Sequence, residues 1–90
     1  EVFQEYGTSE CHHFNGTERV RFLDKLIYNR QLYLHFDSDV GYYVADSPVG
    51  ESTARYFNSQ PEILDNAQSA VDTFCRHNYE IFTRFLVGRQ

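Results

Sequence analysis

The sequence predicts an α+β domain in which one long, broken helix packs across a four-stranded antiparallel sheet. Two patterns carry this prediction. Strand-like runs alternate with turn signals over residues 2–45, whereas apolar side chains recur at three- and four-residue steps over residues 61–78, as on one face of a helix. The chain has 90 residues, which is the size of one small domain.

The first half of the chain has the composition of an antiparallel meander. Asn15-Gly16 is a strong hairpin signal, Asn29-Arg30 is the next turn, and Asp37–Gly41 contains the Asp and Gly that turns favour. The strand-like runs between these turns span residues 2–14, 18–28, 32–36 and 42–45. Within the third run, alternation predicts one face with Tyr33 and His35 and the other with Leu32, Leu34 and Phe36.

The second half changes to a helical period. Residues 51–57 predict a short helical segment before the break at Pro61. Ser59 and Glu62 have the three-residue spacing of a capping box, and proline is tolerated in the first turn of a helix. We therefore expect the long helix to begin near Pro61 and to end near Asn78.

Two cysteines lie on different predicted elements, Cys11 on the first strand and Cys75 near the end of the helix. A bridge between them would close a loop of about 65 residues and stabilise the fold by roughly 4 kcal/mol. The alternative is two free, buried cysteines in a cytosolic protein. Asn15-Gly16-Thr17 is an N-glycosylation acceptor on a predicted hairpin tip, so together with the cysteines it favours a disulfide in a secreted or cell-surface setting.

The predicted sheet is wider than one helix can cover. A helix about 10 Å wide covers roughly two strands that lie about 4.8 Å apart. Alternation from Cys11 places Glu5, Gly7 and Ser9 on the face toward the helix, where a closed core would need larger apolar side chains. We therefore infer a cleft beside the helix, with the remaining surface open or covered by a partner.

The composition excludes some classes of function. Eight Lys and Arg against thirteen Asp and Glu give a net charge of −5, which argues against nucleic-acid binding because that needs a basic surface. No run approaches the roughly eighteen apolar residues of a membrane span, so we expect this fragment to be soluble. The sequence begins with Glu1, so we expect a mature fragment from which any targeting segment has been removed. Aromatic residues make up 17% of the chain, either as ordinary strand residues or as a recognition surface.

The histidines and acidic residues do not form a metal or catalytic motif. His12 and His13 are neighbours on a strand and point to opposite faces, while His35 and His77 lie on different elements. Asp37–Gly41 resembles part of a calcium loop but lacks its third acidic position and distal Glu. We expect no metal, no cofactor and no enzymatic activity.

Several segments resemble the class II major histocompatibility complex (MHC) beta chain, and their uninterrupted spacing covers nearly the whole sequence. They are Glu10–His12, Phe14–Phe22, Ile27–Arg30, Phe36–Gly41, Asn58–Pro61 and Val71–Tyr79. The similarity is to the membrane-distal beta-1 domain, with residues 1–90 as that domain and roughly the last ten beginning the link to an immunoglobulin-like domain. Details such as Phe57 suggest a non-mammalian, avian-like member.

The resemblance implies half of a two-chain peptide-binding groove. In that family the domain pairs obligately with an alpha chain, an extended peptide lies between the two helical walls, and CD4-type T cells read it through their T-cell receptors. It also implies a location at the cell surface and at endosomal or lysosomal membranes, with attachment only through C-terminal parts outside this fragment.

The resemblance further assigns residues to the groove. Asn78 and His77 match contacts to the peptide backbone, a role that suits an amide because it both donates and accepts hydrogen bonds. From the residues alone, Asn78 is better explained as a helix C-cap, and Phe22, Leu26 and Phe74 as plain core. The matched pocket residues are Asn78, Ile81, Phe82 and Phe85 in the first anchor pocket; Ser9, Phe22, Asp24, Asn66, Ala67, Ala70 and Phe74 in the central pocket; Gly7 and Leu26 on the floor; Tyr43, Phe57 and Ile63 in the next pocket; and Glu5, Tyr33, Thr53 and Tyr56 in the last.

Some positions depart from the family pattern. Phe57 replaces a common Trp and loses its indole N–H donor, and Thr53 replaces an Asp that commonly pairs with an alpha-chain Arg. Ala67 replaces an often basic residue and should enlarge the central pocket, which Asp24 should make unfavourable to acidic side chains. Phe82 should shrink the first pocket.

Two other interpretations compete with peptide presentation. A nonclassical relative would exchange peptides or bind none, which Asn78 and His77 argue against. A self-sufficient small enzyme or ligand-binding domain would fold and act alone.

Overall fold

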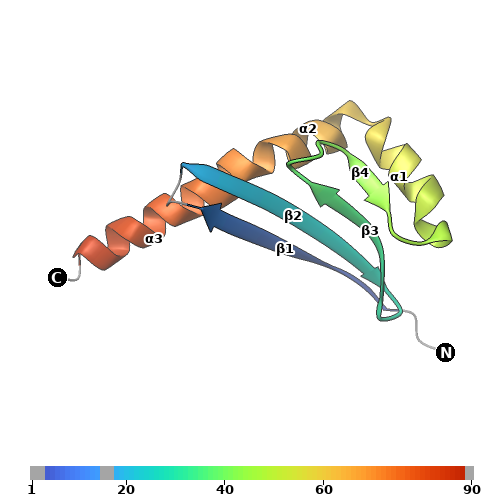
Figure 1. Ribbon diagram of the computed structural model, residues 1–90, viewed down its shortest axis with the longest axis horizontal. Coiled ribbons are helices and arrows are strands. Elements are labelled where there is room, and N and C mark those ends of the chain that lie inside the picture. Colours follow the sequence, from blue (N-terminus) through green and yellow to red (C-terminus); the bar gives the residue numbers. More distant parts are fainter. Residues whose placement is uncertain (1–3, 15–17, 89–90) are drawn as a thin grey trace.

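A chain of helices crosses one face of a four-stranded antiparallel sheet in the computed structural model, which describes residues 4–14 and 18–88 (Figure 1). The strands follow one another in space as β1-β2-β3-β4. Their bounds are Glu5–Phe14 for β1, Arg19–Tyr28 for β2, Gln31–Asp37 for β3 and Tyr43–Ala45 for β4. The helices are η1 (Pro48–Gly50), α1 (Glu51–Asn58), α2 (Pro61–Ala70), η2 (Val71–Arg76) and α3 (His77–Gly88). The predicted fold class is confirmed.

The strand connections follow the turn signals. β1 and β2 pair from Glu5 opposite Tyr28 to Phe14 opposite Arg19. Asn29 and Arg30 between β2 and β3 both have positive φ, 50° and 68°, which suits the right-handed twist of a tight hairpin. Residues 15–17, including the predicted hairpin tip and glycosylation acceptor, lie outside the described residues.

A β-bulge in β3 overturns the predicted alternation of faces. Leu26 of β2 pairs with Leu34 and Ile27 pairs with Leu32, so Tyr33 is an extra residue. A bulge re-aims a side chain. Tyr33 and Leu34 are both buried as a result, whereas Leu32 is exposed.

The predicted capping box before α2 is wrong. Gln60 stands at the N-cap position of α2, and its side chain makes no capping hydrogen bond. Ser59 instead ends α1 in a helical backbone conformation, and its hydroxyl donates to the carbonyl of Tyr56. The Ser59 side chain, which the capping box would need for α2, is therefore bound to the end of α1.

The predicted end of the long helix near Asn78 is also wrong. After α2 the chain forms a π-helical segment, η2, and then continues through α3 to Gly88. No glycine or proline lies between His77 and Val87 to stop it. Asn78 stands in the first turn of α3, which excludes its interpretation as a C-cap.

The core lies between the sheet and the helices and is thin. Its fully buried side chains are Leu34, Phe36 and Cys75. Gly50, which precedes α1, is also buried. A Cβ there would lie 2.0 Å from the Tyr33 carbonyl oxygen, so the glycine lets the start of α1 sit directly on β3. The predicted Cys11–Cys75 disulfide is present, with 5.6 Å between the Cα atoms, and ties η2 to β1.

The molecule is elongated for its length. It measures 51 × 31 × 21 Å, with a radius of gyration of 15.4 Å. A compact chain of this length would have a radius of gyration of about 12 Å. Figure 1 shows α3 running past the end of β1 and β2. Within residues 4–14 and 18–88, none of the helices is long and apolar enough to cross a membrane.

Candidate functional site

A hollow of about 310 Å³, which we name the central hollow, lies over the sheet beside α2. α2 presents one face to it, because its lining residues are three and four positions apart. The floor comes from β2 and β4. The lining residues are Phe22, Asp24, Tyr43, Ile63, Asn66, Ala67 and Ala70. The structure thus brings together residues that the resemblance divides between the central pocket and the next one.

The central hollow has apolar walls and one acidic group. The Asp24 carboxylate accepts a hydrogen bond of 3.1 Å from the hydroxyl of Ser9, its partner across β1 and β2. Burial, followed by the charge of Asp24, raises the pKa of Tyr43. No Lys, Arg or His is among the described residues that line the hollow.

The β4 side of the hollow is held by the last residue of α1. The Asn58 carboxamide accepts from the Tyr43 N–H at 2.8 Å and donates to the Tyr43 carbonyl at 3.0 Å. Phe57 packs edge-on against the Tyr43 ring, with 5.1 Å between the centroids. The sequence does not predict Asn58 as a site residue, because no local pattern indicates that its side chain binds Tyr43, 15 residues earlier.

A second polar group lies at the end of the sheet where β1 begins. The Tyr33 hydroxyl donates to the Glu5 carboxylate. Burial, together with this hydrogen bond, raises the pKa of Tyr33 to about 12. Of the other two residues assigned to this last pocket, Thr53 is half-buried on α1, whereas Tyr56 is exposed and its ring lies 6.1 Å from that of Phe57.

Between the two ends, the floor residues Gly7 and Leu26 pair directly across β1 and β2. Phe22 is buried, as its core interpretation predicts, and Leu26 is half-buried. Phe74 is 42% exposed, so the plain-core interpretation is wrong for it. Its ring lies edge-on to Phe22 at 6.1 Å, beside rather than within the core.

The residues assigned to the first anchor pocket and to backbone contact lie on α3 and are exposed. They share one side of the helix through three- and four-residue spacing. They are His77, Asn78, Ile81, Phe82 and Phe85. The structure does not bring them to the central hollow.

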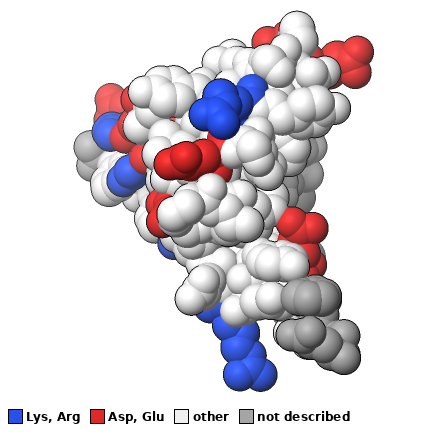
Figure 2. Space-filling model, turned by 90° about the vertical axis from the view of Figure 1, so that its right-hand side faces the viewer, with Lys and Arg blue, Asp and Glu red and all other residues white. Residues whose placement is uncertain are grey.

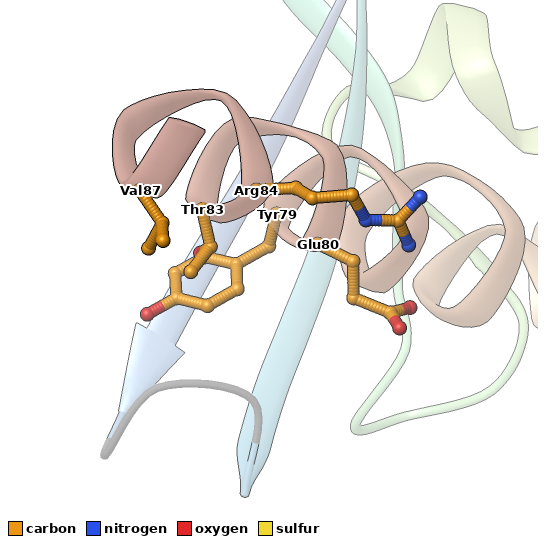
Figure 3. A pocket seen from close by; sticks show the side chains of 5 residues that line it. All are labelled: Tyr79, Glu80, Thr83, Arg84 and Val87. Carbon is orange, nitrogen blue, oxygen red and sulfur yellow. The ribbon is translucent and has the colours of Figure 1, made fainter. Parts of the chain in front are cut away.

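A second, larger depression of about 420 Å³ lies along another side of α3 (Figure 3). Tyr79, Thr83 and Val87 project together, with Glu80 and Arg84 beside them. None of these residues was predicted as a site. The described residues that line it all come from one helix, so we interpret it as surface relief.

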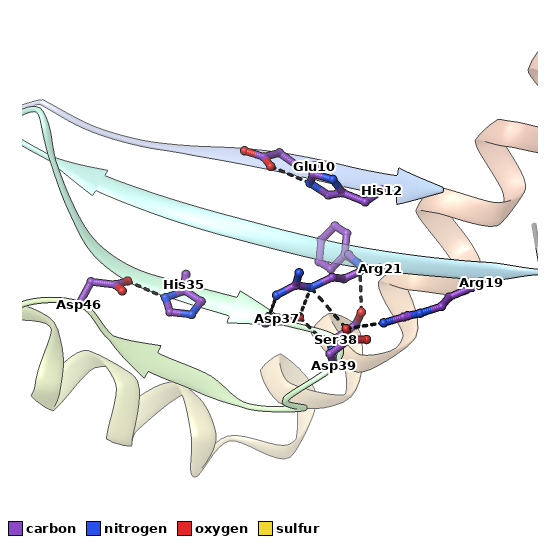
Figure 4. A network of polar contacts seen from close by, with 10 residues as sticks. Glu10, His12, Arg19, Arg21, His35, Asp37, Ser38, Asp39 and Asp46 are labelled. Carbon is purple, nitrogen blue, oxygen red and sulfur yellow. Dashed lines mark hydrogen bonds and ion pairs between the residues drawn. The ribbon is translucent and has the colours of Figure 1, made fainter. Parts of the chain in front are cut away.

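The face of the sheet away from the helices carries ion pairs (Figure 4). Arg21 pairs with Asp37 and Asp39, and Arg19 pairs with Asp39. The acidic residues that suggested a calcium-loop fragment therefore bind arginines, and the described residues contain no group of His, Cys, Asp or Glu that could hold a metal. At the end of the molecule that Figure 2 shows, charges of both signs are interspersed.

The family described as "Class II histocompatibility antigen, beta domain" matches residues 1–83. The chain belongs to this family.

Individual members of the class II family agree with this assignment. The chain is 59% identical to the mouse H-2 class II histocompatibility antigen, E-D beta chain, over 98% of its length. It is 53% identical to the chicken class II B-L beta chain over 98% of its length, and 54% identical to the human HLA class II DRB1 beta chain over 90%. It spans 33%, 38% and 30% of these relatives, respectively.

Proposed function

We propose that this chain is the beta-chain half of a class II groove, which holds an extended peptide and displays it to a T-cell receptor. The central hollow carries the proposal, because it places residues of two expected peptide pockets around one space between α2 and the sheet. A class II alpha chain would supply the other half. The cell-surface or endosomal location, the Asn15 glycan and the linker role of the last residues belong to this proposal.

The shape of the chain supports a need for a partner. β1 is an edge strand of 10 residues, most of them exposed, and an unpaired edge of this length readily accepts another strand. The helices leave Ile81, Phe82 and Phe85 exposed on α3. A second chain that continued the sheet from β1 would close the groove over these residues.

Asn78 is suited to hold a peptide backbone. It lies in the first turn of α3, is exposed, and makes no hydrogen bond with its side chain to another described residue. Its amide can therefore donate to one peptide group and accept from another. Asn78 and His77 precede the apolar positions of α3, so one wall offers polar and apolar contacts in succession.

The proposal is tested by co-expressing the chain with a class II alpha chain and measuring peptide dissociation. Intact mass of the complex should reveal alpha chain and bound peptide. Asn78→Ala should remove two hydrogen bonds of about 1 kcal/mol each and speed peptide loss roughly 30-fold. Thr83→Ala, on another side of α3, should leave the rate unchanged and serves as the control.

Two outcomes would contradict the proposal. An unchanged dissociation rate for Asn78→Ala would favour the nonclassical relative that exchanges or lacks peptide. A stable monomer with catalytic or small-ligand activity of its own would favour an independent domain.

A further inference from the structure

We propose that the central hollow selects peptides with an arginine or lysine side chain at the position that enters it. This inference rests on the proposed function and specifies the chemistry of one bound side chain. It starts from the carboxylate of Asp24, which is the acidic group among the lining residues of an otherwise largely apolar hollow.

Asp24 has an acceptor to spare. One of its carboxylate oxygens accepts from the Ser9 hydroxyl at 3.1 Å, and within the described part of the chain no other side chain bonds to it. Partial burial removes water that would otherwise solvate the negative charge, and one neutral donor does not offset this loss. A cation beside the carboxylate would therefore be stabilising. The missing partner has to enter from outside the chain.

No cation of this chain within the described residues meets that need. Lys25 is next to Asp24 in sequence, but alternation along β2 turns it to the other face of the sheet, where its ammonium pairs with Glu10 at 2.8 Å. Arg21 also points to that face and pairs with Asp37. Both nearby cations are thus paired with acids on the far face of the sheet, whereas Asp24 lies on the face toward the helices.

The rest of the hollow suits a long basic side chain. Ala67 and Ala70 leave room beside the helix, and their methyl groups can pack against an alkyl stem. The aromatic side chains of Phe22 and Tyr43 also line the hollow, and aromatic rings attract cations. The Asn66 carboxamide makes no hydrogen bond to another described residue, so its oxygen can accept a second one from the cation. An acidic side chain would meet repulsion instead.

The test compares matched peptides on the complex with the alpha chain. The peptides differ at one central position, which carries Arg, Lys, Met, Gln or Glu, and their relative affinities come from competition with a labelled peptide. We expect Arg and Lys to bind about tenfold tighter than Met, as for a partly buried charge pair, and Glu to bind weakest. Asp24→Asn should remove the advantage, so that the Arg and Lys peptides bind no tighter than the Met peptide on this variant. Asp65→Asn, an exposed acid of α2 outside the hollow, should preserve the full preference.

The outcomes separate this inference from the proposed function. If all five peptides bind with equal affinity, or Met binds tightest, the basic preference is overturned while peptide binding stands. If Asp24→Asn retains the full advantage of Arg and Lys, Asp24 is not the selecting group. If the complex binds none of the peptides and carries none on isolation, the proposed function fails as well. If Asp24→Asn does not assemble with the alpha chain, the peptide affinities of the unmodified complex decide whether Arg and Lys are preferred.

Discussion

Asp37 shows how one side chain can fix the underside of the sheet. It is buried, with 5% of its surface exposed, although it carries a charge. Arg21 donates to both of its carboxylate oxygens, and the backbone N–H of Asp39 donates to one of them at 2.9 Å. The Arg21 hydrogen bonds hold the pKa of Asp37 below its usual range, against the opposing effect of burial.

This lowered pKa predicts a defined loss of stability in acid. The contribution of Asp37 is complete above the unfolded carboxyl pKa of about 3.9 and is lost as the pH falls through its lower folded pKa. We therefore expect this pair to persist at pH 5. Asp37→Asn should have a lower free energy of unfolding than the parent above about pH 4. Below that pH the free energies of unfolding of the two proteins should converge. Denaturant unfolding of both proteins between pH 2 and 7, on the order of one measurement per pH unit, checks this. A difference in free energy of unfolding that stays constant over this range would contradict it.

The sequence could not predict this arrangement. It showed Asp37 and Asp39 as turn residues and as an incomplete calcium loop, and both features are local. Arg21 lies 16 residues earlier and reaches Asp37 only because β2 and β3 pair. Asn78 is the opposite case: local reasoning favoured a C-cap, and only the observed course of α3 removed that explanation.

At the scale of elements, Asn58 is the clearest link between a helix and a strand. Its two hydrogen bonds to Tyr43 join the end of α1 to the edge strand β4. Asn58→Ala should cost about 2 kcal/mol, because both backbone groups lose their partner. Asn58→Asp keeps the acceptor for the Tyr43 N–H but sets a carboxylate oxygen against the Tyr43 carbonyl, so it should not restore the stability of the parent. Chemical denaturation of the complex with the alpha chain measures both, and a loss under about 0.5 kcal/mol for Asn58→Ala would contradict this role.

The elements themselves could mostly be predicted. The four strands, the short helix α1 and the start of α2 lie where turn residues and apolar periodicity place them. The bulge at Tyr33 could not be predicted, because it depends on how β3 pairs with β2. The helix does not end near Asn78, where the sequence predicts its end, because no glycine or proline interrupts it before Gly88.

At the scale of the whole molecule, the Cys11–Cys75 disulfide joins the two layers across a sequence separation of 64 residues. Its removal by Cys11→Ser with Cys75→Ser should lower the free energy of unfolding by roughly 4 kcal/mol. Because Cys75 precedes His77 and Asn78, the same change should also speed peptide loss. Thermal unfolding and peptide dissociation of the complex measure the two effects. A variant that loses stability but keeps its peptide for as long as the parent would separate them.

The disulfide could be anticipated because the two cysteines lie on different elements and an N-glycosylation acceptor favours an oxidising setting. The cleft could be anticipated from alternation along β1 and from the width of one helix. The grouping of pocket residues came from the resemblance to class II beta chains. The hydrogen bond between Ser9 and Asp24 could not be anticipated, since it depends on the two residues meeting across β1 and β2.

A row of aromatic rings that runs from Phe74 through the core to Phe57 has a consequence for how peptide side chains would act together. Phe74 contacts Phe22, Phe22 contacts Phe36, Phe36 contacts Tyr43, and Tyr43 contacts Phe57. A side chain that displaces one ring therefore presses on the next, as far as α1. Because neighbouring groups that share contacts do not contribute independently, the free energies of two peptide positions along this row should not simply add. Binding rules that score each peptide position separately would then miss part of this molecule's selectivity.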